Sequence, residues 1–504
     1  MRSLLAGVVF AAALLGGTTT EIADVAMKGD MDSLRTLVKQ HPGDVNAALP
    51  DGGTALLWAA YWNDEAAVKA LLAAGANVDT ANRYGVTPLA QASTNGNPQI
   101  VEALLNAGAD ANTFQAEGQT ALMSAARSGS AEAVKILLDH GAEVNSKESW
   151  RGQTALMWAA AENHPAVVQV LVDHGADVNL VSSVFDFTGM KVKPGDVPMH
   201  FPRGGFTALL FAARGGFTEC AKILLDHGAD IKAADPDDTS ALVLAIINGH
   251  YDTAAFLLDR KADPNAADSM GRAALFAAID MRDMYGSNRP APKDSNKVDP
   301  MDLIKMLLDH GADVNAKLAK LIPPRAVLDF PDMMMGEGAT PFLRAAKSAD
   351  IPLMNLLLEK GADPKVVTKA GVTALMVAAG MNHSPSIRGG EQPIEAMKIC
   401  LAKGVDINAA TDKTLNTALH AAAGQGTDDI VQFLADHGAK LDLKDNKGRT
   451  PMEVALGLKA DAVGVEVHQS TADLLRKLMG PAAPATTASA ATPAPAPATN
   501  PTAR

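Results

Sequence analysis

The stretch Thr154-Ala155-Leu156-Met157-Trp158-Ala159-Ala160 decides the fold, because close variants of it recur along most of this 504-residue chain. Each variant opens with threonine or serine, continues with alanine or proline, and then places a large apolar residue. The other copies begin at Thr54, Thr87, Thr120, Thr207, Ser240, Thr340, Thr373, Thr417 and Thr450. Most neighbouring copies are 33 residues apart. A fixed period of this length predicts a solenoid of stacked units.

Each copy predicts a pair of helices. The opening threonine can cap a helix through its hydroxyl, and Pro88, Pro341 and Pro451 take the favoured first helical position. A second helix follows with apolar residues at helical spacing, as in 133–138. It ends at a glycine, which is the usual left-handed cap. These glycines are Gly75, Gly108, Gly141, Gly175, Gly228, Gly311, Gly361, Gly404 and Gly438.

These features together resemble ankyrin repeats. The resemblance rests on Thr87-Pro88-Leu89, on paired alanines such as Ala159 and Ala160, and on Gly-Ala-Asp-Val-Asn at 175–179, and it covers 20–480. It implies an all-α repeat solenoid of about twelve stacked helix-turn-helix units with finger loops. This total includes a degenerate first copy at 22–26 and another that begins at Ala273.

Four insertions interrupt the repeat. Residues 180–203 and 317–337 lengthen finger loops, whereas 284–299 and 382–392 fall between the helices of one unit. The resemblance places finger loops and first helices on the concave, partner-binding side, so the first two insertions belong to that side. Within the first insertion, apolar residues on both sides of Pro194-Gly195-Asp196 predict an extended hairpin.

Both ends of the chain differ from the repeats. A charge at Arg2 followed by the apolar run Leu4 to Leu15 predicts a signal peptide over 1–19, and the chain then resembles exported bacterial multi-ankyrin-repeat proteins. Export would place the protein in the periplasm or outside the cell. The alternative is an N-terminal capping helix of a cytoplasmic protein. Residues 481–504 are rich in Pro, Ala and Thr, which predicts a disordered tail, either a solvated end or a spacer. No other segment is expected to span a membrane.

Composition excludes several classes of function. The net charge of −13 argues against binding of nucleic acid through bulk charge. Cys220 and Cys400 lie four repeats apart and are expected to be unpaired core thiols. No catalytic motif is visible, and we expect neither a cofactor nor a metal site. The methionines at 333–335 could offer thioethers to copper, but filling of apolar gaps is the favoured interpretation.

Histidines precede several of the capping glycines. They are His140, His174, His227, His310 and His437. Their spacing is too large for a shared zinc ion, so we expect each to bond a late carbonyl of its own helix. Two departures from the family pattern stand out: only His420 keeps the histidine usual after Thr-Pro-Leu, and Lys261 replaces a capping glycine.

The candidate partner site consists of residues at positions where core packing does not determine the residue type. These are the finger tips before each capping threonine and the two positions after the paired alanines, where Trp, Tyr and Arg would dominate an interface. The candidates are Tyr61, Trp62, Arg83, Tyr84, Arg127, Trp150, Arg151, Glu162, Phe185, Phe187, Phe206 and Arg214. Trp58 and Trp158 stand where the repeat expects leucine, so both are predicted to be buried core residues.

Two functions remain open from the sequence. The first is a monomeric, non-catalytic scaffold that binds an unidentified protein on its concave face. The second is an enzyme or small-ligand receptor whose site is built by the two long finger insertions. A further alternative is an envelope spacer in which the tail matters more than the face.

Overall fold

A computed structural model of the chain describes residues 20–185, 203–282, 296–322, 334–381, 393–459 and 466–480. The chain divides into two compact units. Unit 1 comprises 1–269 with 290–312, and unit 2 comprises 270–289 with 313–504. The predicted signal peptide, the predicted tail and most residues of the four insertions lie outside the described residues.

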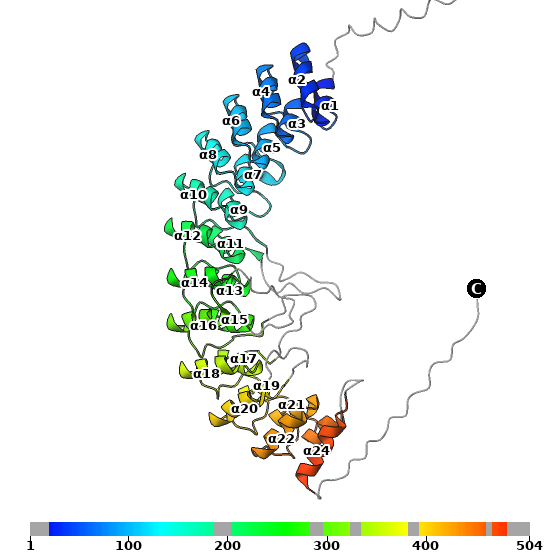
Figure 1. Cartoon of the computed structure of the whole chain (residues 1–504), viewed down its shortest axis with the longest axis vertical. Helices are drawn as coiled ribbons and strands as arrows, with labels where there is room; N and C mark the ends of the chain where they lie inside the picture. Colours follow the sequence, from blue (N-terminus) through cyan, green and yellow to red (C-terminus); the bar gives the residue numbers. More distant parts are fainter. Residues whose placement is uncertain are drawn as a thin grey trace, which may run out of the picture. The chain divides into compact units, whose positions relative to one another are not determined.

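Unit 1 holds seven successive helix pairs and one further α-helix within its described residues. Its helices are α1 (Glu21–Met27), α2 (Met31–Gln40), η1 (Pro42–Asp44), α3 (Ala55–Tyr61), α4 (Glu65–Ala73), α5 (Pro88–Asn95), α6 (Pro98–Asn106), η2 (Ala116–Gly118), α7 (Ala121–Ser128), α8 (Ala131–Asp139), α9 (Ala155–Ala161), α10 (Pro165–Asp173), α11 (Ala208–Gly215), α12 (Thr218–Asp226), α13 (Ala241–Ile247), α14 (Tyr251–Asp259) and α16 (Pro300–Asp309). The first helices of successive pairs pack in one row and the second helices in another (Figure 1).

Unit 2 follows the same plan. Its helices are α15 (Ala274–Arg282), α17 (Pro341–Lys347), α18 (Ile351–Glu359), α19 (Ala374–Ala378), α20 (Pro393–Ala402), α21 (Ala418–Gln425), α22 (Asp428–Asp436), α23 (Pro451–Ala455) and α24 (Gln469–Met479). First helices α15, α17, α19, α21 and α23 are successive neighbours. In chain order the 24 α-helices of the described residues make twelve pairs, which confirms the predicted all-α repeat solenoid.

The only sheet among the described residues lies at the two ends of the first insertion. Strand β1 (Val184–Phe185) pairs antiparallel with β2 (Arg203–Gly204), so that Val184 faces Gly204 and Phe185 faces Arg203. The remainder of the predicted hairpin, including Phe187, lies outside the described residues.

Helix caps form as the sequence predicts. The Thr54 hydroxyl accepts the N–H of Leu57, and Thr154 and Ser240 accept the corresponding N–H of their helices. Pro88, Pro341 and Pro451 occupy the first position of their helices. These threonines are buried, so each cap satisfies a helix terminus that water cannot reach.

Asparagine side chains join neighbouring finger loops. The Asn112 amide donates to the Gly141 carbonyl at 3.0 Å, and its side-chain oxygen accepts the Glu143 N–H at 2.8 Å. Asn179 makes the same pair of bonds to Gly228 and Asp230 across the first insertion. Where an asparagine ends this motif, as at Asn112 and Asn179, it therefore holds its repeat to the next one.

Glycines serve two different needs in the two helix rows. At the ends of first helices they need both a positive φ and space: a Cβ on Gly216 (φ 75°) would lie against the His250 ring, and one on Gly129 against His164. At the ends of second helices only the φ is needed, because nothing lies within 4 Å of a Cβ built on Gly228 (φ 87°).

The histidines before the caps bond the helix that they end, as predicted. The Nδ1 atoms of His174 and His227 each lie 2.7 Å from the carbonyl oxygen four residues earlier, and His140 lies 2.9 Å from its equivalent. His310 and His437 do the same in their helices.

Cys220 and Cys400 are both buried and unpaired, which confirms their predicted role. Burial raises the pKa of each thiol to about 12, which leaves the thiols protonated and unreactive.

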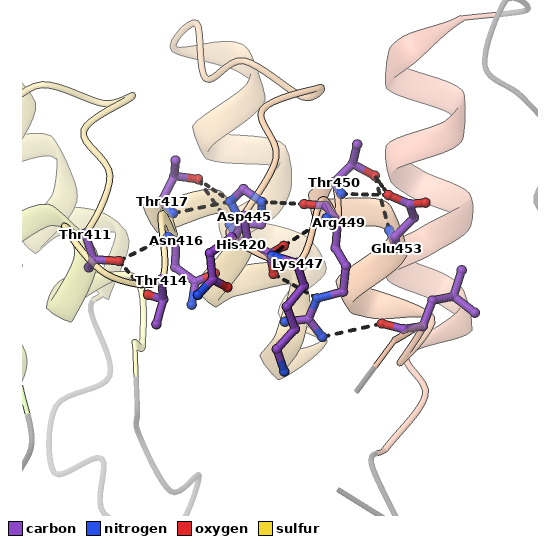
Figure 2. A network of polar contacts seen from close by, with 12 residues as sticks. Thr411, Thr414, Asn416, Thr417, His420, Asp445, Lys447, Arg449, Thr450 and Glu453 are labelled. Carbon is purple, nitrogen blue, oxygen red and sulfur yellow. Dashed lines mark hydrogen bonds and ion pairs between the residues drawn. The ribbon is translucent and has the colours of Figure 1, made fainter. Parts of the chain in front are cut away.

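His420 lies at the centre of a polar network near the end of unit 2 (Figure 2). Its Nδ1 is 3.3 Å from the Thr417 backbone nitrogen, and its Nε2 is 3.1 Å from the Arg449 carbonyl oxygen. Because the carbonyl can only accept and the backbone N–H can only donate, these bonds require a neutral ring that carries its proton on Nε2. Asp445 accepts the backbone N–H groups of Lys447 and Arg449 and pairs with the Arg449 guanidinium at 2.8 Å.

Lys261→Gly is expected to stabilise the protein by about 1–2 kcal/mol, because Lys261 adopts the left-handed conformation, with φ 68°, that costs a residue with a Cβ this amount. The matched control is Gly228→Ala at the equivalent position of the preceding repeat, which should destabilise by a similar amount. Midpoints of urea denaturation measure both changes. A lowered midpoint for Lys261→Gly would contradict the argument.

His420→Leu is expected to cost about 1–2 kcal/mol at pH 7.5 through its lost hydrogen bonds, and less at acid pH. Burial lowers the pKa of His420 below 6.5, so its contribution to stability is present above pH 6.5 and is lost as the pH falls through the folded-state pKa. The free energies of unfolding of the two proteins should therefore converge between pH 7.5 and pH 5. A gap that stays constant would show that the buried ring does not titrate in this way.

Candidate functional site

The candidate partner site lies in unit 1, on the first helices and on the finger loops that extend from the same side (Figure 1). We call the exposed surface of these elements the finger-side face. Four aromatic candidates are about half exposed: Tyr61 (49%), Trp62 (48%), Tyr84 (58%) and Trp150 (55%). Glu162 and the arginines Arg83, Arg127, Arg151 and Arg214 are exposed, whereas Phe185 and Phe206 are half-buried.

Trp58 and Trp158 are half-buried, so the prediction that they are core residues is wrong. Both stand four residues after a capping threonine, on the side of the first helix that faces away from the second-helix row. The equivalent residue is Gln91 in α5, which is also half-buried. Both indole nitrogens are nevertheless shielded and have no hydrogen-bond partner among the described residues. The two tryptophans are therefore half-buried parts of the finger-side face, whereas candidates such as Trp62 are more exposed.

Three aromatic rings form a cluster at α3. The Trp58 and Tyr61 ring centroids are 5.5 Å apart, the Tyr61 and Trp62 centroids are 5.1 Å apart, and both pairs are edge-to-face. Trp62 also packs on Gly29 of the preceding repeat, where a Cβ would lie 3.2 Å from the indole. These contacts hold the rings in place before any partner arrives.

All four candidate arginines lie over aromatic rings. Arg83 lies 4.7 Å from the Tyr84 ring centroid and Arg151 lies 4.1 Å from that of Trp150. Arg127 of α7 lies 5.1 Å from the Trp158 ring of the next repeat. Arg214 lies 5.1 Å from Phe206 and 5.2 Å from Phe211. Such contacts attract the cation to the ring and fix a long side chain against the surface.

Side chains inside the fingers brace the tips that carry these residues. Buried Glu148 accepts the backbone N–H groups of Trp150 at 2.7 Å, Arg151 at 2.8 Å and Gln153 at 2.9 Å. Asn82 accepts those of Tyr84 and Val86 in the earlier finger, both at 3.0 Å. The Arg151 carbonyl in turn accepts the Ser183 N–H of the next finger at 2.7 Å. The tips are therefore held in fixed positions.

Arg151 and Arg214 come close enough to influence one another. Arg214 is exposed, but its neighbours partly desolvate the guanidinium and so lower its pKa, and the charge of Arg151 lowers it further. Two like charges at this point make the surface locally basic, although the chain as a whole is acidic.

The sequence did not identify two features. Phe114 is 69% exposed on the finger before α7, two residues after the clamping Asn112, and an apolar residue in that exposed position was the available signal. In unit 2 the corresponding surface is built differently, because Arg344 of α17 pairs with Asp280 of α15 at 3.0 Å and Arg282 pairs with Asp350 at 2.6 Å. The first of these pairs is largely buried.

No three histidine, cysteine or acidic side chains of the described residues gather as metal ligands, and no described helix has both the length and the apolar character to cross a membrane. The long finger insertions, on which the enzyme or receptor alternative depends, lie mostly outside the described ranges, so this alternative stays a prediction.

Rows of paired short helices, joined by braced loops that expose aromatic and basic side chains, define a repeat protein. A sequence model described as ankyrin repeats in three copies matches residues 22–115, 108–182, 192–268 and 386–465. Another, described as ankyrin repeats in many copies, matches 156–225. Because these matches cover more than half of the chain, the protein belongs to the ankyrin-repeat family.

Curated relatives match parts of the chain. The Neurogenic locus Notch protein of Drosophila melanogaster is 39% identical over 100 residues, 19% of this chain and 4% of the relative. Ankyrin repeat and SOCS box protein 16 of Homo sapiens is 28% identical over 192 residues, 34% of this chain and 42% of the relative. Cyclin-dependent kinase 4 inhibitor B of Rattus norvegicus is 30% identical over 141 residues, 28% of this chain and 100% of the relative. All three come from animals, so they do not bear on the predicted resemblance to exported bacterial proteins.

Proposed function

We propose that the protein is a non-catalytic scaffold that binds a partner protein on the finger-side face of unit 1. The observation that carries this proposal is the row of exposed Trp, Tyr and Arg side chains on elements that are already braced. These residue types supply most of the binding energy in protein interfaces. A surface that is ordered in advance loses little conformational entropy when a partner binds. Membership of the ankyrin-repeat family also supports a protein partner.

Unit 1 is favoured over unit 2 as the partner-binding unit, because equivalent positions of their first helices hold different residue types. Arg127 and Arg214 of unit 1 are exposed beside aromatic rings, whereas the same positions hold Lys347 in α17 and Gly424 in α21. In unit 2 Arg344, which stands four residues after the capping Thr340, is buried and pairs with Asp280. The finger-side face of unit 1 therefore offers the larger area of anchoring side chains.

Replacing Trp62 and Tyr84 together by alanine should weaken partner binding about tenfold or more, because exposed aromatic anchors dominate such interfaces. The measurement is affinity capture with the full chain, followed by titration of the captured partner. The control is Val367→Ala with Val467→Ala, which removes exposed apolar side chains from unit 2. Equal binding of the same partner by the aromatic double variant and the wild type would refute the site.

We also propose that residues 1–19 direct export of the protein. The support is the charge at Arg2 followed by the short apolar run from Leu4 to Leu15. In a Gram-negative host, the wild type should reach the periplasm with a shortened N-terminus, as fractionation and intact mass would show. Val8→Asp with Leu14→Asp should remain in the cytoplasm at full length. A wild-type protein that stays in the cytoplasm with its full mass would contradict export.

A further inference from the structure

Six of the seven arginines in the described part of unit 1 fall into two groups, according to whether they have a carboxylate partner. Arg203 of β2 belongs to neither group, and Arg260 lies over the Phe256 ring in addition to its ion pair. Arg35 and Arg260 pair with carboxylates, Arg35 with Asp64 at 3.1 Å and Arg260 with Asp226 at 2.5 Å. The second group consists of Arg83, Arg127, Arg151 and Arg214. These four lie over aromatic rings, and none has an ion-pair partner among the described residues. Four arginines without such partners therefore lie on the finger-side face, in a chain that carries 57 acidic residues against 44 basic ones.

Stacking leaves these arginines able to bind an anion. A guanidinium carries five N–H donors in its plane, and contact with a ring uses its face and leaves those donors available to a planar carboxylate. A carboxylate that takes two parallel N–H bonds gains both energy and orientation. The neighbouring rings at the same time offer apolar surface, as with Trp158 beneath Arg127 and Trp150 beneath Arg151.

The basic charge is densest from α7 to α11. Arg127 lies on α7, Arg151 at the finger before α9, and Arg214 on α11, so three consecutive repeats each present one guanidinium. Arg151 and Arg214 are like charges on neighbouring repeats. Partial desolvation is the larger cause of the lowered pKa of Arg214, and the charge of Arg151 adds to it, so a carboxylate between the two guanidinium groups would be favoured. Two exposed acidic side chains also lie along this row: Glu117 on the finger before α7 and Glu162 at the C-terminal end of α9.

We propose that the face formed by α7, α9 and α11 binds an extended acidic segment of a partner protein, in which carboxylates alternate with aromatic or aliphatic residues. The inference rests on the proposed scaffold function and specifies the chemistry of its partner. Adjacent helices pack about 8–10 Å apart. An extended chain of polyproline II type advances about 3.1 Å per residue with three residues per turn, so one repeat corresponds to about one turn, and every third residue lies on the same face. Carboxylates spaced about every third residue would meet successive arginines.

The test uses the full chain and a fluorescent 12-residue peptide with Glu at every third position and Leu or Phe between. Fluorescence anisotropy at low salt should show saturable binding that weakens as NaCl is raised, because exposed charge pairs are screened. A peptide with Gln in place of every Glu should bind at least tenfold more weakly. Equal binding of the Glu and Gln peptides would overturn the proposal.

Substitutions in the protein test whether the Glu peptide binds at the arginines of the finger-side face. Arg151→Gln with Arg214→Gln should weaken binding of the Glu peptide at least tenfold. Lys135→Gln with Lys222→Gln makes the same change in net charge on second helices α8 and α12, and it should leave the affinity unchanged. An equal loss in both double variants would mean that only net charge matters, and it would refute the site. Glu162→Gln should tighten binding roughly twofold, because it removes a like charge from the row; weaker binding would count against the geometry.

A single-stranded oligothymidylate of matched length tests the other polyanion that stacked aromatics and arginines could hold. Stronger binding of the oligonucleotide than of the peptide would overturn the proposal in favour of a nucleic-acid site. The proposed scaffold function and the proposed acidic segment can be refuted independently of one another. A natural partner that depends on Trp62 and Tyr84, but not on Arg151 and Arg214, would refute the acidic segment and leave the scaffold intact.

Discussion

Burial of small-residue first helices against one another is the interaction on which the rest of the structure depends. Ala59, Ala60, Ala125 and Ala126 are completely buried, so adjacent first helices approach without large side chains between them. Helices of seven to nine residues, such as α3, α7 and α8, are too short to be stable alone in water. Their stability therefore comes from the interfaces between repeats, with asparagine clamps and buried threonine caps satisfying the polar groups that those interfaces cover.

This arrangement separates the residues that build the fold from those that can carry function. The interfaces use positions near the start of each first helix and along one side of each second helix, and in some repeats they leave the fourth or the seventh residue after the cap at least partly exposed. In unit 1 these positions hold Trp58, Tyr61, Arg127 and Trp158, whereas in unit 2 the fourth position holds Arg344, whose charge Asp280 neutralises. The same scaffold thus presents an accessible cation in one unit and a satisfied ion pair in the other.

Local chemistry made much of the fold predictable, and contacts between repeats account for what was missed. Capping by Thr54 and the histidine bond of His174 involve residues within four positions, so sequence spacing was sufficient. The exposure of Trp158 was mispredicted because leucine is usual at its position in the repeat. The sequence does not show that this position is only half-buried in the folded protein. The stacking of Arg127 on Trp158 joins two neighbouring repeats, so no local pattern contains it. The pairing of Arg344 with Asp280 joins residues 64 positions apart.

A basic face on an acidic protein has a consequence for selectivity. The net charge of −13 repels acidic molecules, but at physiological ionic strength this repulsion is screened beyond about 8 Å, so the arginines dominate only for groups already in contact. A pure polyanion would gain little from the aromatic rings and would still meet Glu162. A segment that combines carboxylates with apolar side chains gains from both guanidinium and ring at each repeat, and these gains accumulate along the row. The finger-side face should therefore discriminate by alternation of charge and apolar surface rather than by charge alone.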